Sequence, residues 1–331
     1  MTSVPPHIVI SLYDGVPKNR LPDAIFDTIV QSIPDCNIHR AISDEDLRQA
    51  VSAADVLWCW RYPADLLAAA PNLRWIHSNS VGVNPLLTPE WIAGDITLTN
   101  GRGLFTIPMA EWIFGAMLAL NLRLPDIIRA QDNRTWIQQT LTSGGQLPTE
   151  LYGKTLGIIG YGGIGRELAH RARTMEMRVI ATRSHPAPDP DLDHCYAAKD
   201  FRDMLKVADY VVIAAPLTPE TDGMIGADEL ALMKSTACLI NVARGKIVDE
   251  AALREALTNG AIRGAAIDAF TKEPLPPDSP WWTTPHLIIN PHNSGFSDRL
   301  WDRIVDLFLR NLQRYRDGEP LENIVPKDRG Y

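Results

Sequence analysis

The sequence predicts a two-lobed α/β protein in which a doubly wound parallel-sheet domain is inserted into a smaller α/β domain. Short apolar segments alternate with helical stretches along the chain, and this alternation starts afresh after a long helix in the middle. An amphipathic helix then follows the last strand of the second series and needs a partner surface. With 331 residues, 45% hydrophobic and 22% charged, the chain can form two cores.

The first series of strands predicts a small α/β domain over residues 1–101. Its predicted strands are residues 7–12, 56–60, 75–78 and 96–99. Helical stretches such as residues 44–53 lie between them.

The pattern changes near Gly101, where a long helix over residues 107–121 begins the approach to the second series. We expect this second domain to occupy residues 102–294. The final helix, residues 297–316, belongs to a segment, 295–331, that we expect to return to the first domain and leave a cleft between two lobes. One face of that helix carries Leu300, Ile304, Leu307, Phe308 and Leu312.

Composition excludes several classes of partner. The net charge is −8 and no basic run is present, which argues against nucleic acid and anionic membranes. The apolar run 107–122 is short for a membrane span, and the N-terminus does not have the pattern of a secretory signal. Neither the cysteines nor the histidines have metal-ligand spacing, so we expect no metal and a cytoplasmic protein with reduced thiols. The cysteines are Cys36, Cys59, Cys195 and Cys238.

A glycine motif follows the predicted strand 155–159 and opens a predicted helix over 162–175, before another strand at 178–182. In this context, G-x-G-x-x-G indicates a Rossmann-type dinucleotide site, because the glycines let a pyrophosphate approach the N-terminus of the helix. A glycine turn used only for packing is the alternative. The motif is Gly160, Tyr161, Gly162, Gly163, Ile164 and Gly165.

The end of the second strand of this unit predicts the cofactor. NAD-dependent proteins usually place an acid there, about 20 residues after the glycine turn. This chain has Arg183 followed by Ser184, which can bind a 2′-phosphate. We therefore expect NADPH to be preferred, with NADH as the alternative if Arg183 is only a solvent-facing loop residue. The later acids, Asp189, Asp191 and Asp193, look too distant.

Three polar residues follow strands of the second series at their carboxyl ends, where such sheets bind ligands. Arg244 follows strand 237–242, Glu273 comes after strand 264–267, and His292 follows strand 287–290. An arginine can hold the carboxylate and carbonyl oxygen of a 2-keto acid, and a histidine paired with a carboxylate can donate a proton. Taken singly, each also has an ordinary structural explanation.

Several separate motifs resemble those of the D-isomer-specific 2-hydroxyacid dehydrogenase family over nearly the whole chain. Within that family, the pattern is most similar to the NADPH-preferring glyoxylate/hydroxypyruvate reductases. Glu273 in place of glutamine separates the chain from formate dehydrogenases, while Asn290, Asn293 and Ser294 depart from the family pattern. The matching segments are 80–83, 108–111, 160–165, 241–245, 248–250, 266–270 with 273–274, 291–292 and 318–321.

The resemblance implies a flavodoxin-like substrate domain and assigns roles to residues. Arg244 would bind substrate, His292 would be the acid/base, and Glu273 would orient His292 and favour its charged form. The amides around Val81 and Gly82 would hold the substrate carboxylate. It also implies a homodimer formed through residues 107–146. The remaining cofactor contacts would come from Ala215, Pro216, Val242, Ala243 and Asp268, together with Arg244 and His292.

These roles predict reduction of a 2-keto acid to the D-2-hydroxy acid. His292 as imidazolium would protonate the carbonyl oxygen while Arg244 stabilises its developing charge. Reduction should therefore weaken as pH rises and His292 loses its proton. Glyoxylate, hydroxypyruvate and a bulkier 2-keto acid stay open as substrates. Trp60, Arg61 or Tyr62 could border the substrate side chain, and Asp268 is expected to shape the site without reacting.

Other functions stay open on sequence grounds. Transcriptional co-repressors related to the family keep the arginine, glutamate and histidine, yet act as dinucleotide-sensing binding proteins. Oxidation of another donor, such as phosphite, is a lesser alternative. His77 and His286 are expected to be structural. Following consumption of the reduced cofactor with a panel of 2-keto acids would separate an enzyme from a binding module.

Overall fold

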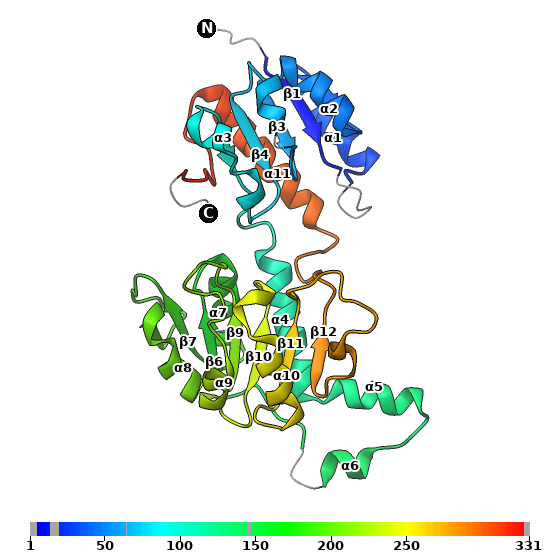
Figure 1. Cartoon of the computed structure of the whole chain (residues 1–331), viewed down its shortest axis with the longest axis vertical. Helices are drawn as coiled ribbons and strands as arrows, with labels where there is room; N and C mark the ends of the chain where they lie inside the picture. Colours follow the sequence, from blue (N-terminus) through cyan, green and yellow to red (C-terminus); the bar gives the residue numbers. More distant parts are fainter. Residues whose placement is uncertain (1–4, 14–19, 64, 144–146, 328–331) are drawn as a thin grey trace. The chain divides into compact units, whose positions relative to one another are not determined.

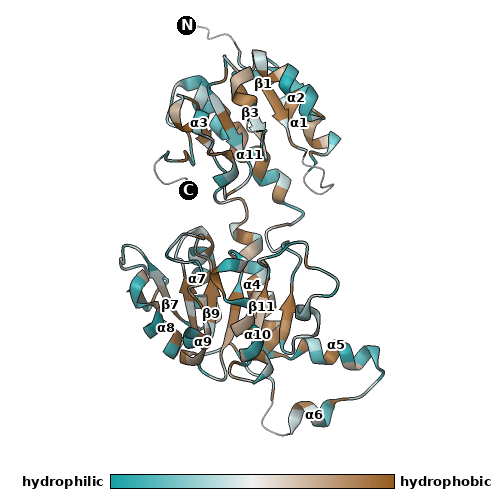
Figure 2. Ribbon diagram, in the orientation of Figure 1, coloured by the Kyte–Doolittle hydropathy of each residue, from teal (hydrophilic) through white to brown (hydrophobic). Residues whose placement is uncertain are grey.

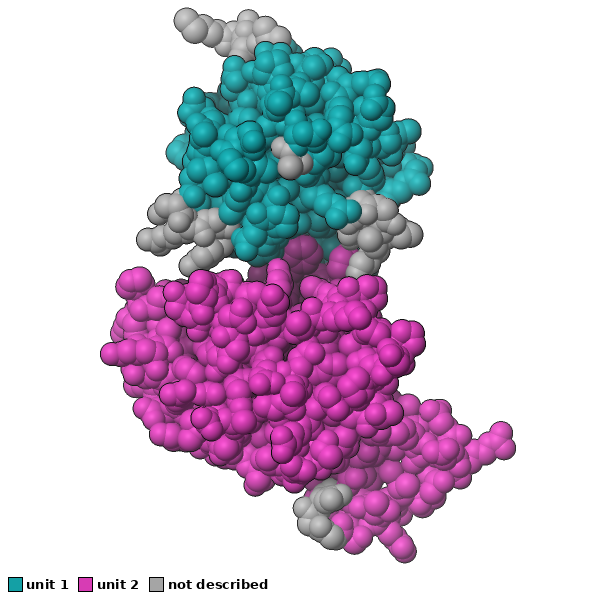
Figure 3. Space-filling model, in the orientation of Figure 1, with its two compact units in different colours: residues 1–104, 298–331 teal, residues 105–297 magenta. Residues whose placement is uncertain are grey.

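The computed structural model describes residues 5–13, 20–63, 65–143 and 147–327, and it forms two compact units (Figures 1 and 3). Unit 1 comprises Met1–Leu104 and Asp298–Tyr331, and unit 2 comprises Phe105–Ser297. The chain thus passes from one unit to the other after residues 104 and 297, whereas the sequence placed these points after residues 101 and 294.

Unit 1 contains a five-stranded parallel sheet in the order β2-β1-β3-β4-β5, which is the flavodoxin-like order. The inner strands β3 and β4 are buried along their whole length, as expected for a parallel sheet covered on both faces. The strands are β1 (His7–Ser11), β2 (Asn37–Arg40), β3 (Val56–Cys59), β4 (Trp75–Ser78) and β5 (Thr97–Thr99). The helices are α1 (Asp23–Ser32), α2 (Asp44–Ala50), α3 (Pro89–Ala93) and α11 (Leu300–Asp317).

Helix α11 completes unit 1 from the C-terminal part of the chain. All five residues of the predicted apolar face are buried, and the Phe308 ring stacks on Trp58 with 3.8 Å between centroids. The helix ends at Asp317 and is capped by Gly318, whose φ of 69° is the left-handed conformation that favours glycine. Its predicted start at residue 297 was wrong, because Arg299 has a non-helical backbone and the helix begins at Leu300.

Unit 2 contains a seven-stranded parallel sheet in the order β12-β11-β10-β9-β6-β7-β8. Figure 2 shows the strands of this sheet as predominantly hydrophobic, with polar residues on the surrounding helices. The chain builds outward from β6 to β8 and then returns to place β9 on the other side of β6. This reversal is a topological switch point, where such sheets bind ligands at the carboxyl ends of the strands.

The elements of unit 2 have the following bounds. The strands are β6 (Thr155–Ile159), β7 (Arg178–Arg183), β8 (His194–Ala197), β9 (Tyr210–Ile213), β10 (Cys238–Asn241), β11 (Gly264–Ile267) and β12 (Leu287–Ile289). The helices are α4 (Thr106–Asn121), α5 (Leu124–Asp132), α6 (Gln138–Thr142), α7 (Gly163–Thr174), α8 (Phe201–Val207), α9 (Ala227–Leu232) and α10 (Glu250–Thr258).

The apolar helix α4 belongs to the core of unit 2. Ala110, Ile113 and Met117 are buried there against side chains of the sheet and of α7. Among the described residues, no single helix has the length and apolar character to cross a membrane; by length and composition alone, the bent pair α4 and α5 could.

Candidate active site

The glycine motif forms a tight turn between β6 and α7. Gly160 has a φ of 95°, and a Cβ atom at this position would lie 2.6 Å from the backbone of Ala215. A Cβ atom on Gly165 would lie 2.8 Å from the carbonyl oxygen of Gly160. No side chain caps the N-terminus of α7, so the amides of its first turn are available to an anion. This arrangement fits a dinucleotide pyrophosphate.

The other predicted cofactor residues in unit 2 lie at the carboxyl edge of the same sheet. Ala215 and Pro216 follow β9, and Val242 and Ala243 follow β10. The Asn241 side chain shapes the turn after β10, since its Oδ1 accepts from the amide of Ala243 at 3.0 Å. Segments after three neighbouring strands, β6, β9 and β10, are thus brought together at the switch point.

Strand β7 ends at Arg183, which is half-buried, and the following Ser184 is exposed. The acids further along the chain are held by other groups. Asp189 pairs with Arg166 at 2.6 Å, and Asp193 accepts from the amide of Val179 at 2.7 Å. Burial by itself would raise the pKa of Asp189, but the Asp191 amide and the Arg166 guanidinium lower it, which keeps this carboxylate charged within its pair.

His292 and Glu273 form a close pair in unit 2. The Nδ1 atom of His292 lies 2.7 Å from Oε2 of Glu273, and Oε1 of Glu273 accepts from the amide of Phe270 at 2.7 Å. A carboxylate can only accept, so Nδ1 carries the proton and Nε2 is left as the nitrogen that can exchange a proton with a ligand. The His292 side chain is 49% exposed, which leaves room for this exchange.

Asp268 holds the backbone around His292. Its Oδ1 accepts from the amides of Asn293 at 2.9 Å and Ser294 at 3.1 Å, and from the side chain of Asn290 at 2.5 Å. Its Oδ2 accepts from the Ser294 hydroxyl. His292 itself has a φ of 52°, which is unfavourable for a residue with a Cβ atom and persists only where the surroundings impose it.

The sequence predicted that Asp268 shapes the site but not which residues it holds, although Asn290, Asn293 and Ser294 were noted as departures from the family pattern. Asp268 is almost fully buried, and its oxygens are occupied by these hydrogen bonds. It therefore shapes the loop that carries His292. A contact of Asp268 with the cofactor stays a prediction.

Arg244 lies in the loop after β10, three residues beyond the end of the strand at Asn241, and is exposed. Its Nη1 donates to the carbonyl oxygen of Ala243 at 2.7 Å, a contact that a ligand can displace. The next residue, Gly245, packs so closely that a Cβ atom there would lie 2.2 Å from the carbonyl carbon of Phe270. The loop of Arg244 is therefore pressed against the loop that carries Glu273. Arg244, Glu273 and His292 follow three adjacent strands, β10, β11 and β12.

In unit 1, the predicted carboxylate-binding residues Val81 and Gly82 lie in the loop after β4. Both are exposed, and neither amide donates a hydrogen bond to the part of the chain that the structure describes. Of the aromatic residues after β3, the Tyr62 hydroxyl donates to the carbonyl of Leu86 at 2.7 Å, while Trp60 lies edge-on to Trp301. Arg61 is exposed.

His77 is fully buried in unit 1, where its Nδ1 lies 2.8 Å from the Thr99 hydroxyl. Burial lowers the pKa of His77 to about 3, so it is neutral at physiological pH. This supports its expected structural role. In the described part of the chain, no three His, Cys, Asp or Glu side chains gather in a way that could hold a metal ion.

Comparisons with known proteins agree with this geometry. Residues 114–294 match the family "D-isomer specific 2-hydroxyacid dehydrogenase, NAD binding domain". A glyoxylate reductase from Korarchaeum cryptofilum is 33% identical over 265 residues, which cover 80% of each chain. A family protein from Aeromonas salmonicida superposes with a TM-score of 0.83 at 32% identity, covering 97% of this chain and 99% of that one.

A second solved structure is the NADPH-dependent glyoxylate/hydroxypyruvate reductase from Sinorhizobium meliloti in complex with NADP and sulfate. It superposes with a TM-score of 0.81 at 25% identity, covering 98% of this chain and 100% of that one. The family match spans more than half of the chain, and the curated relative aligns over most of both lengths. The chain therefore belongs to the D-isomer specific 2-hydroxyacid dehydrogenase family, and it is an oxidoreductase that acts on the CH-OH group of donors.

Proposed function

We propose that this protein reduces a 2-keto acid to the D-2-hydroxy acid with NADPH, using His292 as the proton donor. The observation that carries the proposal is the His292 and Glu273 pair, held on the same edge of the sheet as Arg244 and the glycine turn. The family supports keto acid reduction, and the relative from Korarchaeum cryptofilum is named a glyoxylate reductase.

The chain's own residues divide the chemistry among them. The reduced nicotinamide, when bound, supplies the hydride. His292 Nε2 protonates the carbonyl oxygen while Glu273 holds the ring from the Nδ1 side. Arg244 binds the substrate and stabilises the charge that develops on that oxygen. The amides of Val81 and Gly82 hold the substrate carboxylate.

The function is tested by following NADPH absorbance with 2-keto acids of increasing size, from glyoxylate and hydroxypyruvate to bulkier acids. Substrate-dependent oxidation of NADPH supports the proposal. Binding of the dinucleotide with no turnover on any acid would instead favour a co-repressor-like sensor. If Trp60→Ala leaves the size preference unchanged, the segment after β3 does not select the substrate.

The cofactor preference is predicted to depend on Arg183. In Arg183→Ala, we expect kcat/KM with NADPH to fall by about tenfold or more, because one charged contact with the 2′-phosphate is worth roughly 1.5 to 3 kcal/mol. In the same variant, kcat/KM with NADH should change little. Support comes from the position of Arg183 at the end of β7 and from the pairing of Asp189 and Asp193 with other groups.

Arg178→Ala supplies the matched control, because Arg178 is an exposed arginine at the opposite end of the same strand. It should leave both values of kcat/KM unchanged. A wild-type protein that prefers NADH would contradict the proposed cofactor.

We also propose that the protein is a homodimer formed through the segment that contains α5 and α6. Figure 1 shows these helices extending from the body of unit 2. Exposed apolar side chains gather along this segment and at the end of α4, as expected of an interaction surface. They are Leu118, Leu122, Leu124, Ile127, Ile128 and Trp136. Arg263 anchors the segment, since it donates to Asn121 at 2.7 Å and to Thr149 at 2.6 Å.

The double substitution Ile128→Glu with Trp136→Glu is expected to give a monomer. These side chains are 55% and 88% exposed in the single chain, and charges at both would make burial against a second copy unfavourable. Analytical ultracentrifugation reads the result. Ile42→Glu, which changes an exposed apolar residue of unit 1, should leave the dimer intact. A monomeric wild type would contradict the proposal.

The cysteines support a cytoplasmic location as a further proposal. All four thiols, those of Cys36, Cys59, Cys195 and Cys238, are unpaired. Unpaired thiols are typical of proteins in reducing compartments.

A further inference from the structure

The loop after β11 is held by carboxylates at two consecutive amides. The amide of Phe270 donates to Glu273 at 2.7 Å, and the amide of Thr271 donates to Oε1 of Glu250 at 2.7 Å. Glu273 belongs to the pair with His292, whereas Glu250 is the first residue of α10, 21 positions away from Thr271. The same peptide unit is pressed against Gly245 on its other side.

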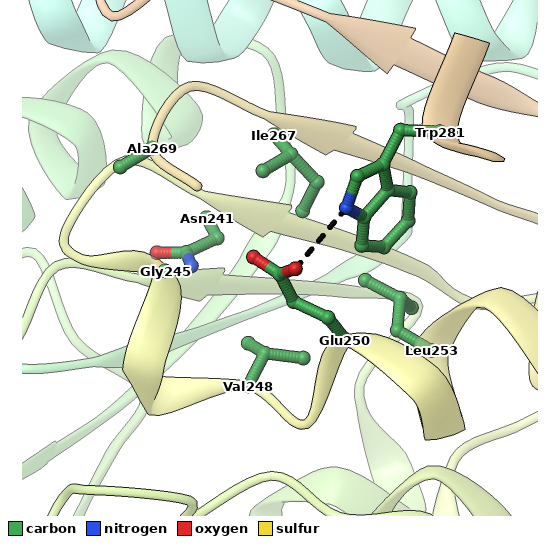
Figure 4. Close-up of a pocket in the computed structure, with 8 residues that line it drawn as sticks. All are labelled: Asn241, Gly245, Val248, Glu250, Leu253, Ile267, Ala269 and Trp281. Carbon is green, nitrogen blue, oxygen red and sulfur yellow. Dashed lines mark hydrogen bonds between the residues drawn. The ribbon is translucent and has the colours of Figure 1, made fainter. Parts of the chain in front are cut away.

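The second oxygen of Glu250 is also engaged. Oε2 accepts from the indole Nε1 of Trp281 at 3.2 Å, and Figure 4 shows the carboxylate pointing toward this ring. Trp281 is 3% exposed and packs edge-on against Phe270, with 5.6 Å between ring centroids. The cavity beside these groups has a volume of about 10 Å³, which leaves room for about one water molecule. On its other side Glu250 lines a larger, open hollow of about 430 Å³, so its bond to the Thr271 amide lies within reach of solvent.

We infer that Glu250 is a positioning residue for the His292 and Glu273 pair. Its hydrogen bonds connect the start of the loop that carries Glu273 to α10 and to Trp281. We infer that these bonds fix the position of the Glu273 carboxylate relative to Nδ1 of His292. The inference rests on the proposed function for its catalytic consequence, but the position of Glu273 can be measured without turnover.

The expected effect follows from geometry. Among the described residues, Glu250 is hydrogen-bonded to Thr271 and Trp281 and to neither His292 nor Glu273, so its loss would act by letting the loop shift. A displacement of about 1 Å in a catalytic arrangement can cost about 100-fold in rate. The dinucleotide turn between β6 and α7 makes no hydrogen bond to Glu250, so cofactor binding should be spared.

The experiment compares Glu250→Ala, Glu250→Gln and Trp281→Phe with the control Glu255→Gln, an exposed glutamate of the same helix. We expect Glu250→Ala to lower kcat by between about tenfold and 100-fold, with unchanged affinity for NADPH measured by fluorescence. Glu250→Gln keeps an acceptor for the Thr271 amide and should restore part of the rate. Trp281→Phe removes only the longer bond and should have a smaller effect than Glu250→Ala.

A spectroscopic readout separates positioning from simple stability. In protein with ¹⁵N-labelled histidine, the Nδ1 proton resonance of His292 is assigned by its loss in Glu273→Ala. We expect this resonance to weaken or shift in folded Glu250→Ala and to stay unchanged in Glu255→Gln. If Glu250→Ala does not fold, Glu250→Gln and Trp281→Phe carry the same comparison.

If the His292 resonance is unchanged in the folded variants, the inference is wrong. A loss of activity in those variants would then reflect only a smaller amount of folded protein. A kcat of Glu250→Ala equal to that of the wild type would also overturn the inference. If the wild-type protein reduces no 2-keto acid, the proposed function fails, and the resonance alone then decides whether Glu250 positions the pair.

Discussion

Replacing His292 with glutamine is expected to lower kcat for the best 2-keto acid by about 10²- to 10⁴-fold, the usual contribution of a positioned general acid. Glutamine keeps a polar side chain near Glu273 but cannot donate a proton to the carbonyl oxygen at a useful rate. Binding of NADPH should persist, because the glycine turn between β6 and α7 is untouched. Steady-state kinetics and a fluorescence titration with NADPH measure the two effects.

A matched control gives a second test of His292, and its turnover should equal that of the wild type. His286→Gln is a matched control, since His286 is also an exposed histidine with a positive φ, of 56°, just before β12. Near-normal turnover in His292→Gln would show that another group donates the proton.

Replacing Arg244 with methionine is expected to lower kcat/KM for the 2-keto acid by about 10²- to 10³-fold, comparable to removing one donor that stabilises an oxyanion. Methionine keeps much of the side-chain length and removes the charged fork. Arg244→Lys should recover only part of the loss, because an ammonium cannot form the bidentate contact. Both effects are read from initial rates over a range of keto acid concentrations.

Lys246→Met is the control for Arg244, because it removes an exposed cation two residues further along the same loop. We expect its kcat/KM to match the wild type. The assignment of Arg244 is wrong if Arg244→Met and Lys246→Met have the same kcat/KM.

Much of the fold could be predicted because its signals are local. Strands such as β6 and β11 are short, fully buried apolar runs, and both lie where the sequence placed them. The inner strand β9 was not predicted, although it is a fully buried run. Two edge strands, β2 and β8, were missed as well. Their residues are partly exposed and include His39 and His194, so they lack the apolar pattern of an inner strand. An edge strand pairs with a neighbour on one side only, so it is recognised by that pairing more than by its own composition.

The sequence by itself determined the alternation of strands and helices, the glycine turn and the residue types that follow the predicted strands, because periodicity and turn chemistry act over a few residues. Tertiary structure decided how those residues are held. The bonds from Asp268 to Asn290 and from Glu250 to Thr271 join positions about 20 residues apart. Such contacts depend on how neighbouring strands bring their loops together, and no local pattern specifies them.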